Sequence, residues 1–242
     1  MRYAFFSDIH GNLEALDTVL TDIHKCNIQQ LICLGDLVGY GANPNECVER
    51  IRIPGYVSVA GNHDYAAVGL TDINNFNTYA RMAILWTVRE LKEENKDYLR
   101  HLPLIRKFDD FIVVHSSLVN PESWHYVVNF QDVEENLRIL KFPICFIGHS
   151  HYPFVVMQSE EGEILSSEQA VVDLQKNCRY LANVGSVGQP RDNDSRAAWV
   201  VYDDNKKTIE RKKSVYDLEA AARKIIAAGL PPFLAERLRY GI

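Results

Sequence analysis

Five short apolar segments of this chain each run directly into a cluster of Asp, Asn or His residues. The segments are 3–6, 31–34, 56–60, 111–114 and 144–147. They lack the alternation of apolar and polar residues, which is typical of strands buried on both faces, and helical patterns between them indicate βαβ units. Open α/β sheets bind ligands at the carboxyl ends of their strands. The pattern therefore predicts an α/β fold with one polar site at a sheet edge.

The residues that follow the apolar segments are of types that bind divalent metal ions. They are Asp8, His10, Asp36, Asn62, His115, His149 and His151. Within 8–10 and within 149–151 the polar side chains are two residues apart, and in extended backbone such side chains point the same way. Seven candidate ligands exceed the four that zinc normally takes. They suit two ions about 3.5–4 Å apart, and Asp36 is the natural bridge because each carboxylate oxygen can hold one ion.

Each motif alone is weak evidence. Gly-Asp is an ordinary turn dipeptide, and single histidines near a core are mostly structural. Five clusters, each at the end of its own apolar segment, favour a metal site over these structural explanations.

Composition excludes several other classes of protein. No apolar run reaches the 18 residues of a membrane-spanning helix, and the N-terminal segment turns polar too soon for a secretory signal. The net charge of −6 argues against specific nucleic-acid binding, which normally uses a basic patch. Five cysteines without CxxC spacing argue against a disulfide framework and a zinc finger. We therefore expect a cytoplasmic protein.

The chain reads as one domain over 1–242, because no repeat, low-complexity tract or linker interrupts it. A helical insertion is expected at about 65–107, which either covers the site or packs on the sheet. The region after 151 is β-rich. A C-terminal helical segment is expected at about 216–240, as a packing element or, alternatively, as a partner-binding helix.

Together, the motifs resemble the five sequence blocks of the calcineurin-like metallophosphoesterases. The matching segments are Asp8-Ile9-His10, Gly35-Asp36, Gly61-Asn62-His63-Asp64, His115 and Gly148-His149-Ser150-His151. The resemblance covers about 1–151 by motif and 1–215 by strand pattern. It implies a four-layer α/β/β/α sandwich, in which two mixed β-sheets flanked by helices pack face to face.

The resemblance also implies a role for each matching residue. One metal ion would be held by Asp8, His10, Asp36 and His151, and the other by Asp36, Asn62, His115 and His149. His63 matches the family histidine that contacts phosphate and protonates the leaving oxygen, and Asp64 is a candidate to orient it. A mixed oxygen and nitrogen set suits Mn, Fe, Zn, Co or Ni, with Mn favoured.

Two further segments narrow the substrate class. Segment 35–41 lacks the Asp-Arg pair of the protein Ser/Thr phosphatases, so a phosphoprotein substrate is not expected. Together with segment 183–192 it is similar to small bacterial and archaeal phosphoesterases. Arg191 is a candidate phosphate contact, because a guanidinium can bind two phosphate oxygens; the alternative is a salt bridge with Asp192 or Asp194. Asn62 and His63 are the other candidate substrate contacts.

The expected function is therefore a phosphoesterase that hydrolyses a small phosphodiester or nucleotide-type substrate through a hydroxide bridging two metal ions. A phosphomonoesterase or a dinucleoside polyphosphate hydrolase is the alternative among enzymes. A metal-stabilised interaction scaffold of the same fold is the alternative of another class, and His63 favours an enzyme over it. The oligomeric state, a homo-oligomer included, stays open.

Overall fold

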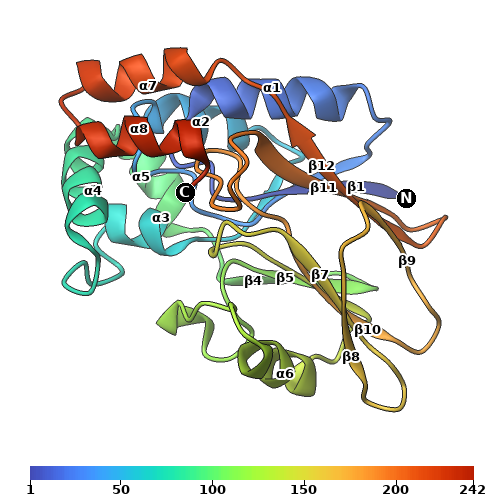
Figure 1. Ribbon diagram of the computed structural model, residues 1–242. Coiled ribbons are helices and arrows are strands. Elements are labelled where there is room, and N and C mark those ends of the chain that lie inside the picture. Colours follow the sequence, from blue (N-terminus) through green and yellow to red (C-terminus); the bar gives the residue numbers. More distant parts are fainter.

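Two six-stranded mixed sheets lie face to face in the computed structural model, which describes residues 1–242 (Figure 1). The first sheet has the order β3 (Val57–Ser58), β2 (Gln30–Cys33), β1 (Arg2–Phe6), β11 (Ala197–Asp203), β12 (Thr208–Ser214) and β9 (Val171–Asp173). The second has the order β4 (Ile105–Lys107), β5 (Phe111–Val114), β6 (Ile144–Ile147), β10 (Arg179–Asn183), β7 (Phe154–Gln158) and β8 (Ile164–Ser167). Strands β1, β2 and β3 are mutually parallel, as are β5, β6 and β10.

Helices cover the outer face of each sheet, which confirms the predicted four-layer sandwich. Over the first sheet lie α1 (Leu13–His24), α2 (Pro44–Ile51), α7 (Leu218–Ala227) and α8 (Pro232–Tyr240), and at one end of it lie α3 (Asn62–Ala67), α4 (Thr78–Glu90) and α5 (Glu93–Arg100) (Figure 1). The second sheet is covered by α6 (Phe130–Ile139), which follows a short 3-10 helix, Pro121–Ser123. None of these helices combines the length and apolar character that crossing a membrane requires.

Strand β1 shows why the apolar segments carry no polar alternation. Ala4 and Phe6 belong to the core between the first sheet and its helices, whereas Phe5 points into the core between the two sheets. There the Phe5 ring stacks on Phe146 of the second sheet, with 3.8 Å between ring centroids. Because both faces are buried from Ala4 to Phe6, these positions of the strand are all apolar.

Two helices begin at capping side chains that the sequence supplies. Asn12 caps α1, where its Oδ1 accepts a hydrogen bond from the Ala15 amide (3.1 Å), and Asp217 caps α7 in the same way through Ala220 (2.9 Å). The insertion at 65–107 contains α4 and α5, which pack into the same core as α1. The C-terminal segment forms α7 and α8.

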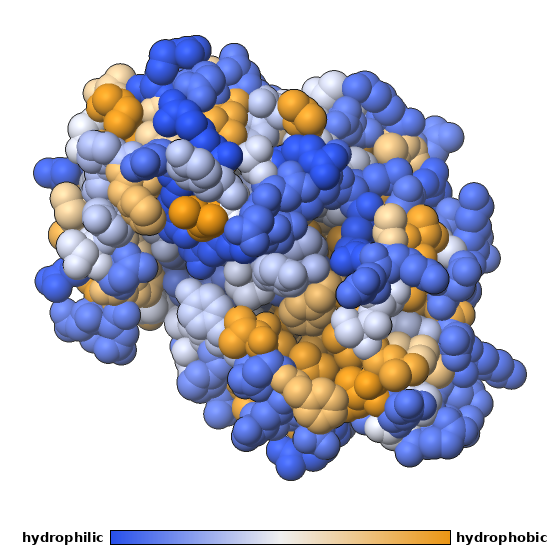
Figure 2. Space-filling view, viewed as in Figure 1, coloured by the Kyte–Doolittle hydropathy of each residue, from blue (hydrophilic) through white to orange (hydrophobic).

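Among the elements that are not predicted from the sequence are α6, β4 and β8. Strands β4 and β8 form the two edges of the second sheet and carry little apolar pattern. Helix α6 does have a readable signal, a capping box in which Asn129 accepts from the Asp132 amide and Asp132 accepts from the Asn129 amide. Apolar residues gather on the surface over α6, β7 and β8 (Figure 2).

Candidate metal centre

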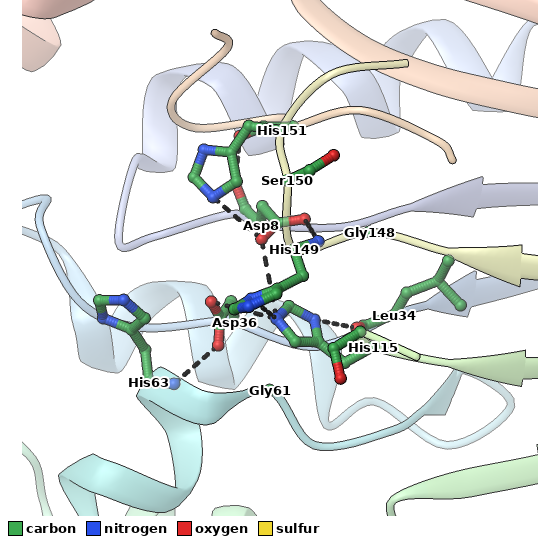
Figure 3. Close-up of polar contacts among 12 residues, drawn as sticks. Asp8, Leu34, Asp36, Gly61, His63, His115, Gly148, His149, Ser150 and His151 are labelled. Carbon is green, nitrogen blue, oxygen red and sulfur yellow. Dashed lines mark hydrogen bonds and ion pairs between the residues drawn. The ribbon is translucent and has the colours of Figure 1, made fainter. Parts of the chain in front are cut away.

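The five polar clusters meet where parallel strands of both sheets end. Beyond the strands the connecting segments stay hydrogen-bonded to one another: the Asp8 amide donates to Gly35 O (3.0 Å) and the His10 amide to Asp36 O (2.9 Å). The Gly148 amide likewise donates to His115 O (2.8 Å). These contacts bring the predicted residues to one buried centre (Figure 3).

Five of the seven predicted ligands have a left-handed backbone. The φ angles are 55° at Asp8, 50° at His10, 52° at Asp36, 66° at His149 and 61° at His151. The prediction of extended backbone across 8–10 and 149–151 is therefore wrong. Residues other than glycine rarely adopt positive φ, and clusters of them mark functional sites where the surrounding structure enforces the strain. The side chains converge because the chain turns sharply at each of these residues.

The first half of the centre consists of Asp8, His10 and His151. The Nε2 atoms of His10 and His151 are 3.1 Å apart, and His151 Nε2 is also 3.1 Å from Asp8 Oδ1. His10 Nε2 is 3.7 Å from Asp8 Oδ1. One oxygen and two nitrogens thus point into a single small volume.

The second half consists of Asp36, His115 and His149. His115 Nε2 is 3.2 Å from His149 Nδ1 and 3.3 Å from Asp36 Oδ2. The same oxygen is 3.6 Å from His10 Nε2, so Asp36 lies between the two halves. The expectation that each Asp36 oxygen faces one half needs correction, because Oδ1 accepts a hydrogen bond from the His63 amide (2.8 Å).

In each of the four histidines, the outer ring nitrogen, which faces away from the centre, contacts a backbone carbonyl oxygen. The contacts are His10 Nδ1 with Val38 O (3.0 Å), His115 Nδ1 with Leu34 O (2.7 Å), His149 Nε2 with Trp124 O (2.9 Å) and His151 Nδ1 with Gln189 O (2.6 Å). A carbonyl only accepts hydrogen bonds, so in a neutral imidazole the proton sits on the outer nitrogen and the inner one presents a lone pair. Histidines that bind metals are typically oriented in this way.

Buried oxygens without partners also fit a divalent cation. Asp8 Oδ1 and Asn62 Oδ1 are buried and accept no hydrogen bond from the protein. A buried polar atom without a partner is costly, and a cation at the centre removes that cost. The residues present therefore fit divalent metal ions, and one histidine pair lies on each side of Asp36.

The charges of the centre favour cations as well. Burial raises the pKa of Asp8 and of Asp36, but the facing histidines outweigh burial and hold both pKa values below the ordinary range. Burial lowers the pKa of His149 to about 3. At His115 burial acts in the same direction, but Asp36 and Asp8 raise the pKa to about 9. Two ionised carboxylates thus face mostly neutral imidazoles.

His63 lies beside the four histidines, at the start of α3. Its ring packs against Tyr40 and Phe76, with centroid distances of 4.6 and 5.0 Å, and its Nδ1 is buried without a hydrogen-bond partner. Burial lowers its pKa to about 4, although Asp36 opposes this. Helix α3 begins directly after Gly61, where any Cβ would collide with Asp36 Oδ1. Only glycine lets α3 begin so close to Asp36.

The structure corrects the role expected for Asp64. Its carboxylate accepts hydrogen bonds from the backbone amides of Leu37 (2.8 Å), Val38 (3.3 Å) and Gly61 (3.0 Å), and none from the His63 imidazole. Burial, followed by the charge of Asp36, raises the pKa of Asp64 to about 7. Through these hydrogen bonds the Asp64 carboxylate links the segment after β2 to the start of α3. It therefore does not orient His63.

Arg191 reaches the centre from the segment after β10. Its amide donates to His151 O (3.4 Å), and its Nη2 donates to Gln189 Oε1 (2.8 Å). The alternative of a salt bridge with Asp192 or Asp194 is wrong, because those carboxylates pair with Lys213 and Arg196 (both 2.6 Å). The Nε atom of Arg191 is buried without a partner, so this cation has bonding capacity left for an anion.

Two residues at the mouth of the site are not predicted from the sequence. The Tyr126 ring stacks on His149, with 4.0 Å between centroids. Arg237 of α8 is half-buried; burial lowers its pKa to about 10, and the nearby positive charge of Arg191 acts in the same direction. Helix α8 thus brings a second arginine toward Arg191. No local pattern distinguishes Arg237 from a surface arginine of an amphipathic helix.

Comparison with known proteins shows the same architecture elsewhere. The model of the calcineurin-like phosphoesterase superfamily domain matches residues 1–206. An uncharacterised protein of Methanocaldococcus jannaschii is 45% identical, over 98% of this chain and 97% of that protein. The crystal structure of a metallophosphoesterase from Sphaerobacter thermophilus is 36% identical with a TM-score of 0.88, over 100% of this chain and 99% of that one. A hypothetical protein of Pyrococcus horikoshii shares the fold at 19% identity, with a TM-score of 0.81 over 100% and 98% of the two chains.

Proposed function

This chain belongs to the calcineurin-like phosphoesterase superfamily, and from that premise we propose that it hydrolyses a small phosphodiester or nucleotide-type phosphate with two divalent metal ions. The observation that carries the proposal is the pair of facing imidazole nitrogens on each side of Asp36, at 3.1 and 3.2 Å. In the His10–His151 pair burial keeps both rings neutral, and two neutral nitrogens at this distance repel each other unless a cation lies between them.

We assign two sets of ligands that share one carboxylate. One ion is held by Asp8, His10, Asp36 and His151, and the other by Asp36, Asn62, His115 and His149. Each set mixes oxygen and nitrogen donors, which suits Mn, Fe, Zn, Co or Ni, and we propose Mn as the first metal to test. When bound, such ions neutralise charge that develops on phosphoryl oxygens and make water at the centre more acidic.

His63 is the proposed proton donor to the leaving oxygen. It stands beside both ligand sets, and burial keeps its imidazole neutral at pH 7 before substrate enters. The negative charge of a phosphoryl group next to the ring would raise its pKa and favour the protonated form. Phe76 and Tyr40 pack against the ring and hold it in place.

Arg191 is the proposed phosphate contact outside the metal ligands. Its guanidinium has no carboxylate partner, and its Nε has no partner in the protein. Charged hydrogen bonds of arginine to phosphate are strong because two N–H groups fit two oxygens. Arg237 adds positive charge at the same mouth.

The location that we propose is the cytoplasm. All five cysteines are free, and Cys33, Cys47 and Cys145 are buried. Buried free thiols of this kind behave as small apolar core residues, and they suit a reducing compartment.

The test is hydrolysis of bis-p-nitrophenyl phosphate beside p-nitrophenyl phosphate by metal-stripped protein resupplied with Mn²⁺. Asp36→Asn and His63→Ala should each abolish most turnover, whereas His24→Ala, at an exposed histidine of α1, should retain it. A preference for the diester supports the proposal. A preference for the monoester overturns it in favour of a phosphomonoesterase, and absence of turnover from folded, metal-loaded protein favours the scaffold alternative.

A further inference from the structure

An apolar groove of about 680 Å³ opens beside the metal centre. It lies between the start of α6 and strands β7 and β8, under the apolar surface seen in Figure 2. Its apolar walls include Val127, Phe130, Val133, Phe154, Val156 and Ile164. A volume of this size is typical of sites for small organic ligands.

The groove borders the proposed active site through two residues. Ser150 and Arg191 line it, and Ser150 lies in sequence between His149 and His151. The amide of Arg191 donates to His151 O (3.4 Å). A single ligand can therefore place a phosphate at the centre and extend into the groove.

Several apolar side chains in the walls of the groove are exposed to solvent. Val128 is 68% exposed, Phe130 is 63% exposed and Tyr152 is 55% exposed. Contiguous exposed apolar surface usually marks a binding site. Arg191 is the only charged residue that lines the groove, and it has no carboxylate partner. The groove is thus cationic where it meets the centre and apolar along its length.

We propose that this groove binds a large apolar ester group, alkyl or aryl, of the substrate whose phosphate lies at the metal centre. The inference rests on the proposed phosphoesterase function and names its substrate class. An anionic phosphate complements Arg191, and an apolar ester group complements the valine, isoleucine and phenylalanine walls. A nucleobase fits less well, because besides Arg191 only Asn129, Ser150 and Ser166 are polar among the residues that line the groove.

The position of His63 indicates which ester group the groove holds. Figure 3 places His63 and Ser150 on different sides of Asp36, and the His63 ring packs against Tyr40 and Phe76, neither of which lines the groove. In an in-line displacement the leaving group departs toward the proton donor. The groove therefore holds the ester group that stays on phosphorus.

The test is a series of p-nitrophenyl alkyl phosphodiesters with methyl, butyl and hexyl groups and Mn²⁺-loaded protein. In each reaction water oxygen bonds to phosphorus, the bond to p-nitrophenolate breaks, and the products are the alkyl phosphate and p-nitrophenolate, with the proton released to solvent. The leaving group is constant, so only binding of the alkyl group varies. We expect kcat/KM to rise at least about tenfold from methyl to hexyl, because each fully buried methylene contributes up to about fourfold.

Substitution of two exposed residues in the walls tests the role of the groove. In the double variant Val128→Asn, Phe130→Asn the ratio of the hexyl to the methyl kcat/KM should fall to about twofold or less. Both substitutions are neutral, so they do not repel an anionic substrate. Val215→Asn, at a 77% exposed valine outside the groove, is the matched control and should keep the ratio of the unaltered protein. Hydrolysis that is equal for all chain lengths overturns the inference and leaves the proposed function standing.

A binding measurement tests the groove independently of hydrolysis. If no diester is hydrolysed, the proposed function fails, and calorimetry with hexylphosphonate and methylphosphonate still tests the groove in Mn²⁺-loaded protein. Binding of hexylphosphonate that is at least about tenfold tighter, and that the double variant loses, supports it; equal binding overturns it. A dimer that the double variant dissociates in sedimentation velocity would show a self-association surface instead and would also overturn it.

Discussion

The Nε2 atoms of His10 and His151 face each other at 3.1 Å although the outer nitrogen of each ring is bonded to a backbone carbonyl. The carbonyls of Val38 and Gln189 cannot donate, so neither inner nitrogen of a neutral pair carries a proton. The backbone thus holds two lone pairs toward each other before any ligand is present. This preorganisation is what a metal ion requires and what a purely structural histidine pair lacks.

Removing one member of this pair should weaken one of the two proposed metal sites. We expect His151→Ala to lower the affinity for Mn²⁺ by at least about tenfold, since even residues that only orient metal ligands contribute this much. Titration calorimetry with the bound metal counted by mass spectrometry measures the effect. His24→Ala, at an exposed histidine, is the control. Unchanged affinity and stoichiometry in His151→Ala would contradict the assignment.

The space around His63 leads to a second prediction, at Gly39. Its φ is +92°, and a Cβ there would collide with His63 Nδ1. Gly39→Ala should displace the imidazole and lower kcat by at least about tenfold, in the range of lost acid–base catalysis. Gly55 has a similar φ of +99° but nothing within 4 Å of its Cβ position. Gly55→Ala therefore reproduces the backbone strain without the collision, and equal loss of activity in both variants would refute a role for the His63 position.

The Asp64 carboxylate should stabilise the folded protein. Its carboxylate accepts from three backbone amides, and Asp64→Ala leaves those buried donors without partners. We expect a loss of about 3 kcal/mol or more in the free energy of unfolding. Urea unfolding of metal-free protein measures it, with Asp97→Ala on the exposed side of α5 expected to cost less than about 1 kcal/mol. A fully stable Asp64→Ala protein with low kcat would restore the orienting role.

The sequence predicts the fold and the convergence of site residues well, because both depend on which residue types follow buried strands. The continuous apolar segments around Phe5 and Phe146 require both sheet faces to be covered, and the family resemblance adds that the covered sheets form four layers. Parallel strands then carry the polar residues after them to one edge.

The sequence predicts the backbone and the long-range partners poorly. Positive φ at Asp8 and His149 comes from hydrogen bonds between segments far apart in the chain, and no local signal marks it. Whether the Asp64 carboxylate turns to His63 or to the Leu37 amide depends on how α3 meets the segment after β2. Arg237 reaches the site only because α8 packs back over the first sheet.

The last prediction concerns Asp194, which lies in the same segment as Arg191, and the pH dependence of stability. Side-chain hydrogen bonds from Arg196 lower the pKa of Asp194 to about 2, from an ordinary value of 3.8. The adjacent Asn193 amide donates to Gly241 O (2.9 Å), which ties this segment to the C-terminus. The folded state favours the ionised carboxyl, so its stabilisation is present above pH 3.8 and is lost as the pH falls toward 2.

Asp194→Asn should therefore destabilise the protein at pH 7, and the difference from the unaltered protein should shrink as the pH falls below about 4. Urea unfolding midpoints of both proteins at pH 7, 5, 4 and 3 measure this dependence. Glu134→Gln, on the exposed face of α6, is the surface control. A difference that grows toward low pH would mean that Asp194 is ionised more readily in the unfolded chain, and the Arg196 contact would then not hold the Arg191 segment in place.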